Sequence, residues 1–268
     1  MSDQGNELLR EQHGGVLRLV LNRPHAGNSF DSAMQRQLID AFVDASGDPD
    51  VRVVVLTAAG DRHFCTGPDL RDPEFAPDPD RRAGDAARRL RIGSHRMIQA
   101  MLDCEKPIVC GLNGTAAGAG ANLVFGADLV VAVEHATIIA LFARRGLIPD
   151  GGAAYLLTRR LPPNIAKQLV FFAEPMTMSD AARFGLVNEV VPADRFATTL
   201  DEWAARLATG PTLAYAAAKQ LLNLAADDGR DASFALEALL VEQVASSDDV
   251  AEGVSAFLDK RDPRFRGR

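Results

Sequence analysis

The most constraining feature of the chain is the small-residue segment 111–122, Gly-Leu-Asn-Gly-Thr-Ala-Ala-Gly-Ala-Gly-Ala-Asn. It follows the short apolar run 107–110 and leads into Leu123–Phe125, whose spacing continues a helix. A short apolar run is typical of a buried strand, and clustered glycines are typical of a tight turn. The segment therefore predicts a strand, a close turn and a helix start, as in an α/β protein.

A helix start made of small residues has a chemical consequence. The first backbone N–H groups of a helix have no partner within the helix, and the helix dipole adds partial positive charge there. Small side chains let another group approach those N–H groups closely. The segment is therefore suited to hold an oxyanion or a polarised carbonyl. Close packing of the helix against the strand explains the same residues, and on the segment alone both interpretations stay open.

Around this segment, hydrophobic spacing predicts alternating short strands and helices. Asp31 and the pair Thr177 and Asp180 are placed to cap two of the helices. His95, inside one expected helix, is interpreted as a packed or surface residue. The expected strands are 8–12, 16–21, 51–57, 128–133, 136–142 and 186–191; the expected helices follow Asp31 and Thr177 and cover 86–104, 153–160 and 164–172, with a loop over 71–84.

Strand patterns stop at Asp194, and the rest of the chain has helical spacing. The expected helices are 196–207, 212–224, 232–245 and 250–258, with breaks at 210–211, 227–229 and 246–249. The chain is therefore expected to divide into a core of strands and helices over 1–195 and an all-helical region over 196–268. A helical tail of this kind usually packs on the core or on another subunit.

Composition argues against several classes of function. The chain has 268 residues, 47% of them hydrophobic, and a formal net charge of -7, so it can form a core and has no overall basic surface for nucleic acid. No run approaches the roughly 18–20 apolar residues of a membrane helix, and the polar N-terminus 1–7 does not resemble a signal peptide. Cys65, Cys104 and Cys110 lack zinc-site or disulfide spacing. We expect a soluble cytoplasmic protein with reduced thiols and no metal.

Six groups of residues carry a resemblance through their order along the chain. They are 21–24 with Asn28; 64–70; Asn113 and Gly114 with Gly118 and Gly120; 146–150; 181–187; and Glu252 and Gly253 with 256–261, Pro263 and Phe265. Taken together, they resemble the crotonase (enoyl-CoA hydratase/isomerase) family. The resemblance extends from about residue 8 to the C-terminus and rests on the order of the motifs rather than on any one of them.

The resemblance implies an α/β fold, a crotonase-like spiral of ββα repeats with a C-terminal all-helical region used in trimer contacts. It implies a homotrimer or a homohexamer built as a dimer of trimers. It also implies an acyl-CoA thioester as substrate, with no cofactor besides the coenzyme A that the substrate carries. The family stabilises a thioester enolate with two backbone N–H groups, whose positions here are Pro68 and Ala119. Ala119 lies in the helix start already suited to an oxyanion.

Pro68 departs from the family pattern because proline has no backbone N–H. Losing one such donor costs on the order of 10²–10³ in rate in acyl-transfer enzymes. Two compensations stay open. The loop could turn the Asp69 N–H or the Thr66 hydroxyl inward, or the protein could bind acyl-CoA with little catalysis.

Two glutamates of the family's hydratases, which handle a water and a proton, correspond here to Asn122 and Phe142. Neither side chain transfers a proton, so plain hydration is disfavoured. Asp150 is the remaining candidate, because its position resembles the carboxylate of some isomerases and the nucleophile of aryl-CoA dehalogenases. One carboxylate can remove a proton beside a thioester and return it further along. Asp150 also resembles a helix N-cap, where N–H groups would lower its pKa while burial would raise it.

The resemblance also places substrate-binding residues. They are Gly67, Asp69, Leu70, Gly118 and Phe142 at the acyl-CoA, with Arg23, Arg71, Lys260 and Arg261 as phosphate candidates. Solvated surface charge is the alternative for each basic residue. Arg144 and Arg145 would pair with Asp150 or line the acyl pocket. The leading hypothesis is isomerase-type proton transfer by Asp150 on an unidentified acyl-CoA, and the alternative is a non-catalytic acyl-CoA-binding protein.

Overall fold

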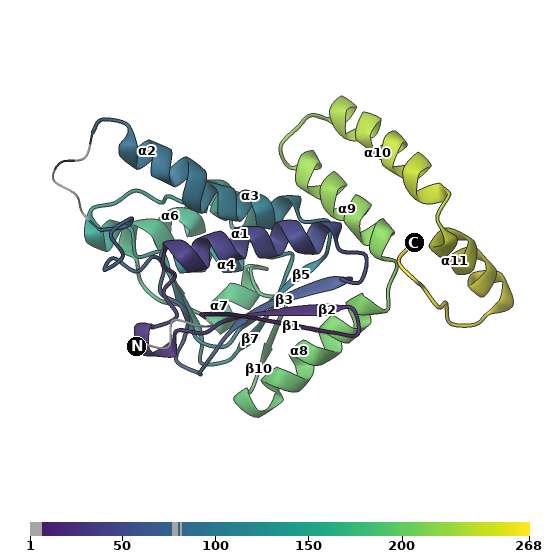
Figure 1. The fold of residues 1–268 in the computed structure, drawn as a ribbon, viewed down its shortest axis with the longest axis horizontal. Coiled ribbons are helices and arrows are strands. Elements are labelled where there is room, and N and C mark those ends of the chain that lie inside the picture. The colour runs from purple at the N-terminus through teal and green to yellow at the C-terminus, as the bar shows by residue number, and fades with distance from the viewer. Residues whose placement is uncertain (1–6, 77–79, 81) are drawn as a thin grey trace.

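The computed structural model describes residues 7–76, 80 and 82–268 of the chain (Figure 1). Residues 1–6 of the polar N-terminus and part of the loop expected over 71–84 lie outside the described residues. Two sheets and the helices around them form the body of the molecule, and the last three helices extend to one side of it (Figure 1).

The larger sheet consists of Leu8–His13 (β1), Val16–Leu21 (β2), Val53–Ala58 (β3), Ile108–Leu112 (β5), Leu129–Val133 (β7) and Glu189–Val191 (β10). Its strand order is β1-β2-β3-β5-β7-β10. The two expected strands β1 and β2 form an antiparallel hairpin, and the later neighbours are parallel. Every residue of β3 is buried, because strands covered on both faces are apolar throughout rather than alternating.

The smaller sheet consists of His63–Cys65 (β4), Thr115–Ala117 (β6), Thr137–Ile139 (β8) and Met176–Thr177 (β9), in the order β4-β6-β8-β9. In each repeat of the body, a strand of the larger sheet is followed by a strand of the smaller sheet and then by helix. The repeats are β3 and β4, β5 and β6, and β7 and β8, each followed by helix. The expected architecture of ββα repeats is therefore confirmed.

The helices of the body begin with the caps that the sequence indicates. The Asp31 carboxylate accepts a hydrogen bond from the Met34 N–H at 2.8 Å, and the Thr177 hydroxyl accepts one from the Asp180 N–H at 3.2 Å. The expected helix over 86–104 is continuous but contains a π-helical turn, η2. These helices are Ser32–Gly47 (α1), Asp85–Leu90 (α2), Arg91–His95 (η2), Arg96–Asp103 (α3), Ala119–Gly126 (α4), Ala153–Arg160 (α5), Pro163–Phe172 (α6) and Met178–Arg183 (α7), with short 3₁₀ turns at Pro24–Ala26 (η1) and Ala143–Arg145 (η3).

Helix α8 (Ala193–Ala208) packs on the larger sheet and belongs to the body. Its residues Leu200 and Ala204 join a buried cluster with Val53, Val55 and Val109 of the strands. This cluster lies on the face of the sheet opposite the main core, because alternate residues of a strand point to opposite faces. The boundary expected between residues 195 and 196 therefore falls inside a helix that covers the sheet.

Helices α9 (Thr212–Ala225), α10 (Arg230–Ala245) and α11 (Asp248–Asp259) form the part that we call the arm (Figure 1). Lys219 of α9 ties the arm to the body: its buried ammonium pairs with Asp128 at 2.9 Å and donates to the carbonyls of Met101 and Lys106. The arm carries many exposed apolar side chains. They include Leu222, Phe234, Leu239, Val241, Phe257 and Leu258.

Candidate active site

The glycines of the segment 111–122 serve two different purposes. A Cβ atom on Gly111 would lie 2.4 Å from the Leu200 side chain of α8. One on Gly120 would lie 2.3 Å from the Cys65 carbonyl oxygen. At Gly120 the clash is with backbone, so only glycine fits, and at Gly111 the Leu200 side chain would have to move; other elements pack closely at both positions, which supports the packing interpretation for them. A Cβ atom on Gly118 would instead meet nothing within 4 Å among the residues that the structure describes.

Gly118 opens the helix start toward this free space. It has a positive φ of 55°, its N–H donates to Ile139 O at 2.9 Å, and α4 begins at Ala119. The N–H groups of Ala119 and Gly120 meet no acceptor within the described part of the chain. Gly67 lies opposite them, since a Cβ atom on it would be 3.5 Å from Ala119 N and 3.6 Å from Gly120 N. The absence of that atom keeps the space in front of both donors open.

By sequence, the loop around Gly67 could supply a second hydrogen-bond donor to the thioester oxygen, from the Asp69 N–H or the Thr66 hydroxyl. Pro68 has no N–H. The Asp69 N–H donates to Phe30 O at 2.8 Å, so it does not turn inward. The Thr66 hydroxyl lies against Gly27, only 3.1 Å from where a Cβ atom of that glycine would be. The inward turn of the Asp69 N–H is therefore not seen, because that group already holds the loop, while the Thr66 hydroxyl lies beside Gly27.

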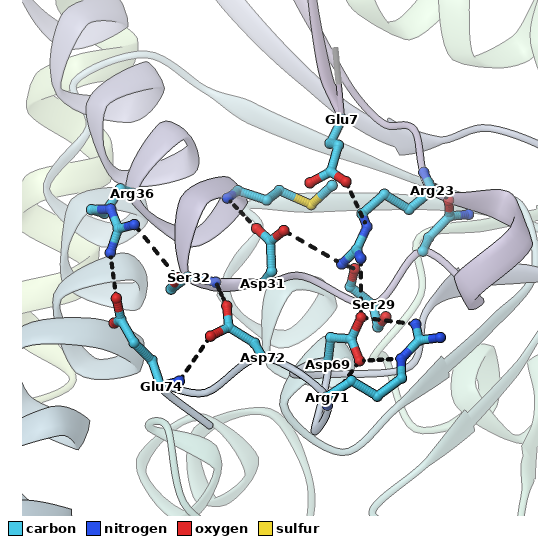
Figure 2. A network of polar contacts seen from close by, with 12 residues as sticks. Glu7, Arg23, Ser29, Asp31, Ser32, Arg36, Asp69, Arg71, Asp72 and Glu74 are labelled. Carbon is cyan, nitrogen blue, oxygen red and sulfur yellow. Dashed lines mark hydrogen bonds and ion pairs between the residues drawn. The ribbon is translucent and has the colours of Figure 1, made fainter. Parts of the chain in front are cut away.

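A network of charged side chains around Arg23, Asp69 and Arg71 holds the same loop (Figure 2). The Asp69 carboxylate accepts from Arg71 at 2.8 Å and from Arg23 at 3.0 Å, and the Arg71 guanidinium holds the pKa of Asp69 well below its usual range. Arg23 also pairs with Glu7 at 3.1 Å and donates to Ser29 O at 2.8 Å. Arg23 is buried, so the structure corrects its expected role: its donors support the loop and do not face a phosphate.

Asp150 lies in the turn before α5 and does not cap that helix. The N-cap is Gly152, and no side chain provides the capping bond. The Ala153 N–H instead bonds to the backbone oxygen of Asp150 at 3.0 Å. The N-cap interpretation of the Asp150 side chain is therefore wrong. Burial raises the pKa of Asp150, and the nearby charge of His95 only partly opposes that shift.

Asn122 joins the helix start to the Asp150 turn. Its side-chain Nδ2 donates to the backbone oxygens of Asp150 at 2.9 Å and of Gly151 at 3.1 Å. Asn122 is only 1% exposed, and its Oδ1 atom has no hydrogen-bond partner among the described residues. Phe142, the other residue at a glutamate position, is also buried and precedes the η3 turn. The structure thus brings Ala119, Asn122 and Asp150 to one place.

Three residues near this place have no counterpart among the expected site residues. Ser94 and His95 lie in the π-helical turn η2, and Gln35 of α1 donates from Nε2 to Ser94 Oγ at 3.2 Å. Gln35 is buried on the same helix as the core residues Met34 and Leu38. A glutamine among core residues was a usable signal, because a buried amide requires polar partners. Ser94 carries no such signal in the sequence.

The remaining expected site residues are exposed. Arg71 keeps most of its side chain in solvent although it pairs with Asp69. Leu70 is half-exposed, and Lys260 and Arg261 follow α11 at the end of the arm. Arg144 and Arg145 lie on the exposed η3 turn, and among the residues that the structure describes neither forms an ion pair with Asp150.

Three observations concern metal-binding groups, membrane-spanning helices and cysteines in the described ranges. No group of three or more His, Cys, Asp or Glu side chains within them could hold a metal ion. No helix in the same ranges is long and apolar enough to cross a membrane. Cys65, Cys104 and Cys110 are buried free thiols, as expected, and burial raises the pKa of Cys65 to about 12.

Comparison with known proteins gives matches along nearly the whole chain. A family model described as enoyl-CoA hydratase/isomerase matches residues 11–268. A 1,2-epoxyphenylacetyl-CoA isomerase of Escherichia coli (strain K12) is 36% identical over 261 residues, which cover 97% of this chain and 98% of that protein. A carnitinyl-CoA dehydratase of Proteus mirabilis (strain HI4320) is 32% identical over 259 residues, covering 95% and 96%. A crystal structure of an enoyl-CoA hydratase/isomerase from Cupriavidus metallidurans CH34 matches with a TM-score of 0.91 at 30% identity, covering 98% of this chain and 97% of that one. The last match confirms the fold expected from the sequence.

Proposed function

Because the chain belongs to the enoyl-CoA hydratase/isomerase family, we propose that it is an isomerase-type enzyme that moves a proton within an acyl-CoA thioester, with Asp150 as the base. The observation that carries this proposal is the meeting of Ala119, Asn122 and Asp150. The helix start supplies N–H donors that are unpaired among the described residues, and the half-buried carboxyl group of Asp150 belongs to the turn that the Asn122 amide holds.

The proposed reaction uses the thioester oxygen as an electron sink. Ala119 N–H donates to that oxygen, and the α4 dipole favours negative charge at the same place. Asp150 takes a proton from a carbon conjugated with the thioester, and the electron pair of that C–H bond moves into the enolate. Asp150 then returns the proton to another carbon of the conjugated system, so the double bond shifts and no atom is gained or lost.

The half-buried position of Asp150 suits its role as a base. A general base is most effective when its pKa lies near the working pH, and burial moves the pKa of Asp150 upward from its usual value. The amide of Asn122 and the ring of Phe142 cannot accept a proton from water. Proton transfer by one carboxylate is therefore favoured over hydration with two.

The missing donor at Pro68 calls for a different partner for Ala119. We assign this role to the Gly120 N–H, which is also unpaired in the described part of the chain and also faces Gly67. Two consecutive N–H groups at a helix start can converge on one oxygen. For coenzyme A, the exposed Arg71 and the cationic end of the arm at Lys260 are the remaining phosphate candidates.

The exposed apolar side chains of the arm support assembly into a trimer or hexamer. A contiguous apolar surface on a folded protein marks a contact with another molecule. Phe234, Leu239 and Val241 of α10 and Phe257 and Leu258 of α11 are each more than half exposed in the single chain. A second copy of the same chain is the proposed partner.

Proton exchange tests the proposed function directly. The chain and its Asp150→Asn variant are incubated in deuterated buffer with a panel of 2-enoyl- and 3-enoyl-CoA thioesters, and deuterium at the α and γ carbons is followed by NMR. We expect exchange in the native chain and a loss of at least about 10²-fold in the variant, the usual worth of a general base. Equal exchange in both proteins would remove Asp150 from the mechanism. Tight binding without exchange on any thioester would favour the acyl-CoA-binding alternative.

A further inference from the structure

Asn122 stands three residues after Ala119 on the same helix. Residues at this spacing lie on one face of an α-helix, one turn apart. Ala119 and Asn122 therefore share one face of α4, and the Asn122 side chain reaches the Asp150–Gly151 turn from there. The amide is fully buried, and both of its donor hydrogens are used on the Asp150–Gly151 turn.

The two acceptors determine how the amide is oriented. Both are backbone carbonyl oxygens, so only the NH₂ end of the side chain can face them. The Gly151 backbone packs directly on that end, because a Cβ atom on Gly151 would lie 2.9 Å from Asn122 Nδ2. Gly151 also has a positive φ of 59°, which favours glycine. A carboxylate at position 122 would oppose its oxygens to those of the turn.

A second support holds the turn from the other side. A Cβ atom on Gly151 would lie 3.3 Å from Ser94 Cβ, so the turn is held between Asn122 and the π-helical turn η2. Ser94 is itself held by its hydrogen bond with Gln35. π-Helical turns are frequent at functional sites because they redirect side chains within a helix. The backbone at Asp150 and Gly151 thus has the hydrogen-bonding Asn122 amide on one side and the half-buried Ser94 side chain on the other.

The Asp150 carboxyl group, in contrast, has no side-chain partner of its own within the described residues. The groups that act on it are its own backbone N–H and the charge of His95. The direction in which the carboxyl group points is therefore set by its main chain, which Asn122 holds.

We propose that Asn122 is a positioning residue: its side-chain amide holds the Asp150–Gly151 turn so that the half-buried Asp150 carboxyl group keeps its direction toward the substrate. The inference rests on the proposed function of Asp150. In this proposal, Asn122, which stands at the position expected for a family glutamate, does not transfer a proton. It orients Asp150, the single remaining base.

The chain offers a matched control in Asn113. Its Nδ2 also donates to two backbone oxygens, those of Ala58 at 2.7 Å and Gly60 at 2.6 Å, and it is also buried with an unpartnered Oδ1. Asn122→Leu and Asn113→Leu each remove two buried hydrogen bonds at similar side-chain volume. A general loss of stability should therefore be similar in the two variants, whereas a loss of positioning belongs to Asn122→Leu alone.

Two measurements decide the proposal. In the exchange assay, we expect kcat to fall about 10²-fold in Asn122→Leu, the effect of a small misplacement of a catalytic group, with KM changed little and with Asn113→Leu close to the native chain. In parallel, ¹³C-labelled aspartate follows the titration of Asp150. We expect its pKa to fall toward the usual value in Asn122→Leu, because the freed turn exposes the carboxyl group to water, and to stay in Asn113→Leu.

The titration needs no turnover, so it separates this inference from the proposed function. Absence of exchange in the native chain would refute the proposed function, while the Asp150 titration would still test the support by Asn122. If Asn122→Leu fails to fold, Asn122→Ala serves in its place with Asn113→Ala as its control. An Asp150 titration and a kcat that are the same in the variants at both positions would overturn the inference.

Discussion

Replacing Pro68 with alanine should increase the proposed activity, although proline removal usually weakens a loop. Phe30 N–H donates to Gly67 O at 3.0 Å, and Asp69 N–H donates to Phe30 O at 2.8 Å, so residue 68 forms a parallel bridge with Phe30. In such a bridge, the residue between the two bonded neighbours directs its own N–H away from the partner strand. Pro68→Ala would therefore supply an N–H on the side of the loop away from Phe30.

The magnitude follows from the value of one oxyanion donor. Removing such a donor costs about 10²–10³ in kcat, or about 2.7–4 kcal/mol. We expect a gain near the lower limit, about 10²-fold, because the Gly120 N–H already lies beside Ala119 N–H. The loss of proline rigidity costs only about 0.4–1 kcal/mol of stability. The network around Arg23 and Asp69 continues to hold the loop (Figure 2).

The assay is deuterium exchange into the best thioester of the panel, measured as kcat for Pro68→Ala and for the exposed control Pro73→Ala. A double variant with Asp150→Asn should lose the gain, because a stabilised enolate still requires the base. A folded Pro68→Ala protein whose kcat is unchanged or lower would refute the reasoning. In that case, the N–H of residue 68 would not reach the thioester oxygen.

Two further predictions concern Asp150 and the arm. Burial raises the pKa of Asp150, so its carboxylate becomes protonated at a higher pH than an ordinary aspartate. The acid limb of kcat/KM should therefore lie at higher pH than for an exposed carboxylate. An acid limb at or below the pKa of an ordinary aspartate would contradict this. Lys219→Ala should lower the free energy of unfolding by about 3 kcal/mol, the low end for breaking a buried pair, because Asp128 keeps some solvent contact and its bond to Ile108 N–H. Urea denaturation measures this loss, with the exposed Lys167→Ala as the control. Equal free energies of unfolding for the two variants would show that Lys219 does not hold the arm on the body.

The elements of the fold that sequence reasoning located are those specified locally. Asp31 and Thr177 cap helices because a short polar side chain reaches an N–H three residues on. The run at 53–58 is a strand because β-branched and apolar residues suit a sheet covered on both faces. The place of α8 was different, because its contact with the sheet is long-range: Leu200 meets Gly111, 89 positions earlier in the chain.

In the candidate site, too, the features set by neighbouring residues were predictable and those set by distant partners were not. The unpaired N–H of Ala119 was predictable, because the start of a helix is determined by residues that are consecutive in the sequence. The burial of Arg23 and the engagement of Asp69 N–H were not, because each depends on a partner that folding brings in from elsewhere. For Asp150, adjacent residues indicated a helix cap, yet the backbone places Gly152 at that position.

The link between Asn122 and Asp150 explains why the local interpretation of Asp150 failed. A capping aspartate must turn its side chain back to the helix, but here the backbone oxygens of residues 150 and 151 are bound by an amide from α4. The carboxyl group has no capping role there, and its partial burial raises its pKa instead of lowering it. The Asn122 amide and the proposed role of Asp150 as a base are therefore parts of one arrangement, because the same two hydrogen bonds hold the turn that carries the carboxyl group.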